Sequence, residues 1–176
     1  MMPMGRRTQR GNDRRRRSLM NADLEAVILD VLDSCRELSL ATLMADGNTQ
    51  SDVVCFVHHG LDIYFATGRD SRKMANIERA AQVSFCLYKP YVGWPDIKAL
   101  SGHAFAEILS DESSERVLAM RLLDERFPDA WTRVPEHGSS RSTIVKLECW
   151  ALQVLDYSRG FGHADIVTVP SKRRCE

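Results

Sequence analysis

Short apolar segments, separated by turn residues, recur at regular intervals through this chain from residue 38 onward. The first two segments are joined by Asp46-Gly47, a dipeptide typical of tight hairpin turns. Short strands at such regular spacing are typical of antiparallel barrels and sandwiches. We therefore predict a mainly β domain, a β-barrel with α-helices, whose strands lie at 38–44, 49–57, 61–66, 82–88, 97–109, 142–148 and 149–156.

Helical patterns interrupt these strands at three places. The first follows Asn21, a favourable helix cap, and its apolar residues recur at helical spacing as far as Cys35. We expect this helix to cover the barrel like a lid. The second helix is predicted at 71–80. The third opens at Ser110 and stops at Pro128, because proline cannot continue a helix.

Size and composition favour a single compact domain. The chain has 176 residues, 44% of them hydrophobic, which suffices for one sizeable core. No apolar run approaches the roughly 20 residues that a membrane-spanning helix needs, so we expect no membrane partner. The five cysteines are scattered and form no C-x-x-C pair. This pattern predicts neither a disulfide framework nor a zinc site, and it favours a cytoplasmic protein.

Two further patterns exclude function classes. His58-His59 lies in a predicted turn with no other ligand at suitable spacing, so we predict no metal site there. The G-x-S-x-G nucleophile elbow is absent, which argues against a hydrolytic triad of that kind.

The formal net charge of zero conceals a basic N-terminal segment. Residues 1–18 contain seven arginines and a single acid, Asp13. The segment has no aromatic residue and no apolar stripe, so it is neither a stacking platform for bases nor an amphipathic membrane helix. We predict a disordered tail over 1–19 and no specific nucleic-acid partner.

An anion-binding pattern spans residues 63–76. An apolar strand runs into Gly68, whose backbone freedom permits close approach to a ligand. Asp70 or Ser71 is then placed to cap the following helix. The free N–H groups and the positive dipole end of that helix favour an anion. Three cations lie in the same turn: Arg69, Arg72 and Lys73. The pattern predicts a phosphate cradle, and the alternative is a solvated turn with ordinary surface cations.

Several segments together resemble the pyridoxamine 5′-phosphate oxidase family. Thr67 followed by Ser71-Arg72-Lys73 is similar to the phosphate-binding segment of that family, and three other parts resemble its strands in the same order: 38–43 with the turn 46–47, 81–87, and 100–107. The resemblance covers roughly residues 20–157. It implies an antiparallel FMN-binding split β-barrel, and a homodimer with the flavin at the interface. It leaves 1–19 as the basic tail and 158–176 as a C-terminal tail.

The same resemblance implies which residues hold the flavin. Arg72 and Lys73 match the phosphate-binding pair of the family, Ala66 and Thr67 match positions at the ribityl-phosphate end, and the backbone of 51–54 would face the ring. The expected cofactor contacts are Ser51, Asp52, Val53, Val54, Ala66, Thr67, Arg69, Ser71, Arg72 and Lys73. Trp150 is either a core aromatic or a residue along the flavin edge.

Two departures from the family pattern bear on activity. Ile97 stands where the true oxidases place a glutamine that touches the flavin. The C-terminal tryptophan-glycine-arginine and arginine-leucine-histidine-aspartate signatures, which hold pyridoxal phosphate, are absent. The resemblance therefore implies a flavin-dependent oxidoreductase whose small-molecule substrate is not a form of vitamin B6. No side chain stands out as catalytic. The electron partner stays open among nicotinamide, a quinone-like acceptor, oxygen and a deazaflavin.

Two other functions fit the same fold. Gly160-Phe161-Gly162-His163-Ala164 resembles the glycine-rich C-terminal segment of heme-utilisation split barrels, in which His163 would be the axial ligand. The alternative for this segment is a flexible tail with a surface histidine. The second function is a non-catalytic flavin-binding stress protein. An absorption spectrum separates flavin from heme, and turnover with reduced nicotinamide separates an enzyme from a flavin buffer.

Overall fold

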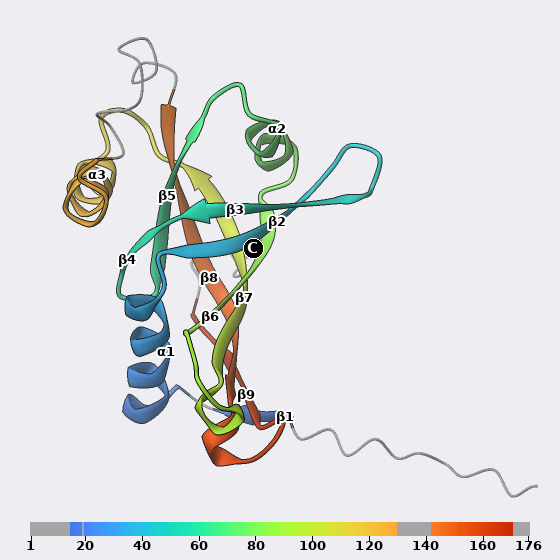
Figure 1. Cartoon of the computed structure of the whole chain (residues 1–176). Helices are drawn as coiled ribbons and strands as arrows, with labels where there is room; N and C mark the ends of the chain where they lie inside the picture. The colour runs from blue at the N-terminus through green and yellow to red at the C-terminus, as the bar shows by residue number, and fades with distance from the viewer. Residues whose placement is uncertain (1–14, 19, 130–141, 171–176) are drawn as a thin grey trace, which may run out of the picture.

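The computed structural model describes residues 15–18, 20–129 and 142–170, in which one curled β-sheet is flanked by helices (Figure 1). The strands are β1 (Arg15–Ser18), β2 (Glu37–Leu43), β3 (Thr49–Cys55), β4 (Val57–His59), β5 (Asp62–Gly68), β6 (Gln82–Tyr88), β7 (Lys98–Ile108), β8 (Ser142–Asp156) and β9 (Ala164–Thr168). The α-helices are α1 (Ala22–Ser34), α2 (Arg72–Arg79) and α3 (Ser114–Arg126). Two short 3-10 helices, η1 (Trp94–Asp96) and η3 (Tyr157–Arg159), follow β6 and β8.

The long strand β8 organises the sheet. The strand order is β1-β9-β8-β7-β6-β2-β3, and all neighbours except the parallel pair β1 and β9 are antiparallel. One edge of β8 pairs with β7, while its other edge pairs first with β5 and then with β9. Among the described residues, β3 pairs only with β2, and β5 only with β4 and β8. The barrel is therefore split between β3 and β5, which confirms the predicted split β-barrel.

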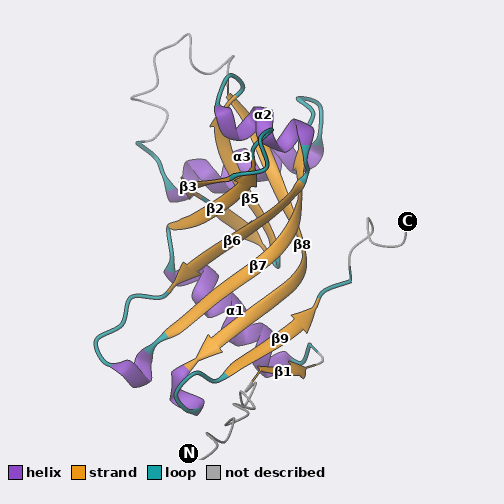
Figure 2. Ribbon diagram, turned by 90° about the vertical axis from the view of Figure 1, so that its right-hand side faces the viewer, coloured by secondary structure: helices purple, strands orange, loops and turns teal. Residues whose placement is uncertain are grey.

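The main core lies inside this curled sheet. Strand β2 shows why, since its buried Leu38, Leu40 and Thr42 alternate with more exposed residues. Helix α1 begins at the predicted cap, where the Asn21 side chain accepts a hydrogen bond of 2.9 Å from the Leu24 amide. Its buried residues belong to the main core, and the helix lies along the curled sheet, as expected for a lid (Figure 1, Figure 2). Each large apolar side chain buried there contributes about 1.5–3 kcal/mol.

A smaller core lies under α3, on the other side of β5. Ala119 and Leu123 of α3 pack there with Tyr64 and Ile144. Burial raises the pKa of Tyr64 to about 12. The ammonium of Lys146 lies beside this core and contacts Glu115 at 2.6 Å and Asp62 at 3.0 Å. Burial alone would lower the pKa of Lys146, but the hydrogen bonds to these two carboxylates raise it above its ordinary value.

The structure corrects five sequence predictions. The predicted strand 49–57 is divided into β3 and β4, and His58-His59, expected in a turn, lies in β4, where it pairs with β5. The segments 142–148 and 149–156 are one strand, β8, in which the predicted break is a register shift opposite His103 and Ala104. Residues 164–168, expected in a C-terminal tail, form β9 because their alternating pattern of buried residues packs against β8. Residues 15–18, expected in a disordered tail, form β1 on the edge of β9.

The fifth correction concerns α3. It begins at Ser114 rather than Ser110, because the Ser113 side chain caps it by accepting from the Glu115 amide at 3.2 Å. In the described part of the chain, no helix has the length and apolar character needed to cross a membrane.

Candidate functional site

The turn from β5 into α2 has the local structure of an anion-binding loop. Strand β5 ends at Gly68, and the Ser71 amide donates to the Gly68 carbonyl at 3.1 Å. Ser71 is the cap of α2, since its hydroxyl accepts from the Met74 amide at 3.3 Å. The Thr67 hydroxyl lies 3.2 Å from the Ser71 hydroxyl. This arrangement presents the first N–H groups of α2 at its positive dipole end, where an anion is favoured.

The three cations of this turn have different surroundings. Arg72, at the first position of α2, is exposed. Lys73 is largely buried, with 18% of its side chain exposed, and its ammonium lies 3.9 Å from the Asp52 carboxylate. Arg69 points to Asp111, with contacts of 3.2 and 3.3 Å. We use the term cradle for Thr67, Ser71, Arg72 and Lys73, which lie in and beside the turn from β5 into α2.

A chain of hydrogen bonds leads from the barrel interior to the cradle. The buried Asn76 amide donates to the Thr42 hydroxyl at 3.0 Å and to the Gln50 side-chain oxygen at 3.3 Å. Gln50 in turn donates to Asp52 at 2.9 Å. The Asp52 carboxylate, beside Lys73, is therefore fixed through helix α2 and strands β2 and β3. We call Thr42, Asn76, Gln50 and Asp52 the polar relay.

Strand β3 places its predicted residues on two faces. Asp52 and Val54 point inward with Gln50, whereas Ser51 and Val53 point outward, and Val53 is 74% exposed. The outer hydroxyl of Ser51 lies 2.9 Å from that of Ser39. Because β3 is an edge strand, its outer backbone N–H and C=O groups are available to a ligand.

Ala66 and Thr67 lie on β5, across the split, so the predicted segments on β3, β5 and α2 do come together at this end of the barrel.

Trp150 lies in a different place from the cradle. It is the extra residue of β8 at the register shift, a geometry that re-aims a side chain. Its ring stacks on His103, with centroids 5.2 Å apart, and the His103 ring nitrogen Nδ1 lies 2.9 Å from the Ser84 hydroxyl. The three residues line a cavity of about 600 Å³ whose lining includes no residue of the cradle.

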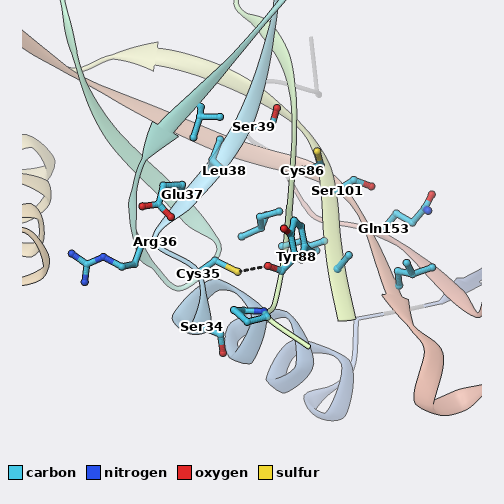
Figure 3. A pocket seen from close by; sticks show the side chains of 16 residues that line it. Ser34, Cys35, Arg36, Glu37, Leu38, Ser39, Cys86, Tyr88, Ser101 and Gln153 are labelled. Atoms are coloured by element: carbon cyan, nitrogen blue, oxygen red, sulfur yellow. Dashed lines mark hydrogen bonds between the residues drawn. The ribbon is translucent and has the colours of Figure 1, made fainter. Parts of the chain in front are cut away.

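A second cavity, of about 730 Å³, was not predicted from the sequence (Figure 3). Ser39, Cys86, Ser101 and Gln153 form a row across β2, β6, β7 and β8 along its wall. At its edge the Cys35 thiol donates to the Tyr88 carbonyl at 3.1 Å, and burial raises the pKa of that thiol. The sequence signal for this surface is the uncharged residue at each of four paired outward positions, Ser39, Cys86, Ser101 and Gln153.

The remaining histidines of interest already have partners. Both ring nitrogens of His58 are engaged, with the Gly60 carbonyl and with Asp33, each at 3.0 Å. His163 Nε2 lies 3.1 Å from Asp165, a buried carboxylate that also accepts from Arg159 at 2.7 Å. In the described residues no group of three or more potential ligand side chains could hold a metal ion.

Comparison with known proteins gives a family and a set of similar folds. The family model of pyridoxamine 5′-phosphate oxidase matches residues 24–153. A search of the curated proteins finds no match. A heme binding protein from Mycobacterium smegmatis is 17% identical with a TM-score of 0.69; the match covers 85% of this chain and 58% of that protein, so this chain spans little more than half its length.

Two other solved structures have similar folds. A conserved hypothetical protein from Mycobacterium tuberculosis is 21% identical with a TM-score of 0.66, over 88% of this chain and 94% of its own. A structure described as an F420 reductase is 20% identical with a TM-score of 0.57, over 70% of this chain and 93% of its own. At these identities the similarity shows the fold alone.

Proposed function

Since the chain belongs to the pyridoxamine 5′-phosphate oxidase family, we propose that it binds FMN through the cradle and is a flavin-dependent oxidoreductase. The observation that carries this proposal is the position of Arg72 and Lys73 directly after the Ser71 cap of α2. Two cations and a helix start in one turn match the charge and the acceptor oxygens of a terminal phosphate.

The position of the flavin ring follows from the phosphate position. With its phosphate held at the start of α2, FMN would be contacted by Ala66 and by the free edge of β3. The backbone groups of 51–54 would then bond the polar edge of the ring. When bound, the flavin supplies hydride or single-electron transfer. The chain itself binds the cofactor, orients it and limits the access of water to one side of it.

A homodimer is part of this proposal. In one protomer, Ile97 and the cradle are at opposite ends of β6, because α2 leads into Gln82 while Tyr88 pairs next to the start of β7. A contact between position 97 and the flavin, as the family pattern implies, therefore needs a second protomer. The outward row Ser39, Cys86 and Ser101 is uncharged, as in the centre of an interface.

The substrate we propose is a small molecule other than a B6 vitamer. Ile97 offers no polar side chain, and the residues after β8 form η3 and β9 without the signatures that hold pyridoxal phosphate. The heme alternative would require His163 as the iron ligand. Its Nε2 atom is engaged with Asp165 inside an ion-pair cluster, which argues against that role.

The test is flavin occupancy of the purified protein and of an Arg72→Ala/Lys73→Ala variant. We expect a flavin absorption band at about 450 nm rather than a heme absorption band at about 400 nm. The double substitution should weaken FMN binding by several kcal/mol, since each charge-assisted hydrogen bond contributes about 1.5–3 kcal/mol. Arg121→Ala, which removes an exposed arginine of α3, is the matched control.

Unchanged occupancy in the double variant, or a heme spectrum, would contradict the proposal. Turnover of reduced nicotinamide or another electron donor by the FMN-loaded dimer distinguishes an enzyme from a flavin-binding stress protein. Sedimentation tests the dimer separately, and a monomer with bound FMN would contradict the interface.

A further inference from the structure

We propose that Asp52 determines the charge selectivity of the cradle, by offsetting Lys73 so that a doubly charged phosphate binds only slightly better than a singly charged one. The inference rests on the proposed flavin-phosphate site. The family resemblance implies only that the backbone of residue 52 faces the flavin ring. The role proposed here belongs to the Asp52 carboxylate.

Asp52 and Lys73 form a widely spaced, partly buried ion pair. The Asp52 carboxylate lies 3.9 Å from the Lys73 ammonium, beyond hydrogen-bond distance but within ion-pair distance. Both side chains are largely buried, with 24% and 18% exposed, so solvent and salt screen their charges only in part. Among the described residues no hydrogen bond uses the N–H donors of Lys73, while its charge is opposed by a neighbouring carboxylate.

The polar relay holds the Asp52 carboxylate in place. Gln50 donates to Asp52 at 2.9 Å, and the buried Asn76 amide donates to Gln50 and to Thr42. Asn76 is 6% exposed and Thr42 is 1% exposed. Asp52 occupies an inward position of β3, on the same face as the buried Val54, where a mainly apolar interior would take an apolar side chain.

Carboxylates oppose most of the positive charge in the turn from β5 into α2. Arg69 is paired with Asp111, and Lys73 with Asp52, so two of the three cations are opposed by a carboxylate. Arg72 has the least opposed charge of the three, since it is exposed and has no ion pair with the described residues. With one cation and a helix N-terminus left unopposed, the second negative charge of a phosphate gains only a little additional attraction.

The chemical consequence is a choice between two classes of phosphate. A phosphomonoester such as FMN carries nearly two negative charges at neutral pH, and a phosphodiester carries one. Because the Asp52 carboxylate repels the second negative charge of a monoester, it reduces the difference in affinity between monoesters and diesters. The cradle therefore accepts flavin-type ligands with a phosphodiester almost as well as FMN.

The experiment compares three probes of increasing charge at pH 7.5: riboflavin, the methyl phosphodiester of FMN, and FMN. In the wild-type dimer we expect the diester and FMN to bind within about threefold of each other, both more tightly than riboflavin. In Asp52→Asn, whose amide oxygen still accepts from Gln50, FMN should bind about fivefold tighter, the diester about twofold tighter, and riboflavin unchanged.

Two further variants separate charge from structure. Asp52→Glu keeps the carboxylate and should retain the wild-type ratio of FMN to diester affinity within about twofold. Glu78→Gln removes an exposed acid from the far end of α2 and should change no probe. Urea unfolding of each variant reports any general loss of structure.

The outcomes distinguish this inference from the site it rests on. If wild-type protein binds FMN no better than riboflavin, the cradle is not a phosphate site and both proposals fail. If FMN is preferred but Asp52→Asn leaves its affinity unchanged, lowers it, or alters riboflavin equally, the phosphate site stands and the role of Asp52 is wrong.

Discussion

Two partly buried lysines, Lys73 and Lys146, meet carboxylates in different ways. Lys146 contacts Glu115 and Asp62 at 2.6 and 3.0 Å, distances at which its donors are used. In the part of the chain that the structure describes, Lys73 meets one carboxylate, Asp52, at 3.9 Å, which is too far for a hydrogen bond. The exposed fractions of the two side chains are similar, 13% and 18%. The two lysines are therefore alike in burial and differ in how closely their carboxylates approach, which makes Lys73 the better candidate for ligand binding.

The largest expected effect is the loss of ligand affinity when Lys73 is replaced. Lys73→Met should weaken FMN binding by about 2–3 kcal/mol, because a charge-assisted bond to phosphate is lost. The free energy of unfolding should change by less than about 0.5 kcal/mol, as for other weak ion pairs. Fluorescence titration with FMN and urea unfolding measure the two quantities. A large loss of stability with unchanged FMN affinity would make Lys73 equivalent to Lys146.

Lys146→Met should give the opposite pattern. Removal of the ammonium breaks two short bonds and leaves Glu115 and Asp62 to be solvated, so we expect a loss of about 2 kcal/mol in the free energy of unfolding. FMN affinity should stay within about twofold of wild type. The same two assays measure this variant, and a strong effect on FMN binding would place Lys146 in the site.

The caps of α2 and α3 extend the comparison to the helices. Ser71 and Ser113 each accept a hydrogen bond at the start of their helix, so Ser71→Ala and Ser113→Ala should each cost about 1 kcal/mol of stability. Only Ser71→Ala should also weaken FMN binding, because Ser71 lies in the cradle. Equal FMN affinities in the two variants would contradict the cradle.

The smallest effect is the pH dependence of the Lys146 contribution. The pKa of Lys146 is raised in the folded state, so its contribution is fully present below the ordinary pKa of 10.5 and is lost as pH rises toward the folded value. We expect the difference in stability between wild type and Lys146→Met to be constant from pH 7 to 9 and to fall by about 0.8 kcal/mol by pH 11. Urea unfolding across this range tests it, and a difference that grows with pH has the wrong sign.

The cradle was predictable from the sequence because it is local. Gly68, Ser71, Arg72 and Lys73 are consecutive parts of one strand-turn-helix unit, and the cap and the helix dipole act within a few residues. The short strands were predictable for the same reason. Strand β2 is recognised from the alternation of its residues over seven positions, and the Asp46-Gly47 turn follows it within a few residues.

The contact between Lys73 and Asp52 was not predictable in the same way. It depends on how α2 packs against the inner face of β3, and the two residues come from different elements. The sequence of β3 is polar over 49–52 and apolar over 53–55, so it does not show that Gln50 and Asp52 point inward.

The continuity of β8 was also missed. The pattern around Trp150 breaks its alternation, and a sequence does not distinguish the end of a strand from an inserted residue. Strand β9 was hidden for a different reason, since Gly160 and Gly162 have the positive φ angles of turns and resemble the start of a tail. The continuity of β8 depends on its pairing with β7, and the formation of β9 depends on its pairing with β8.

The long strand β8 also has a consequence for the order of folding. Its partners β5 and β7 are made much earlier in synthesis, and its pairing with β5 joins Ile63 to Leu147. Until β8 is made, one edge of each partner lacks its neighbour, and such edges invite pairing between chains. Contacts this far apart in sequence slow the formation of a native sheet. The nascent chain is therefore most prone to aggregate during the interval between the synthesis of β7 and that of β8.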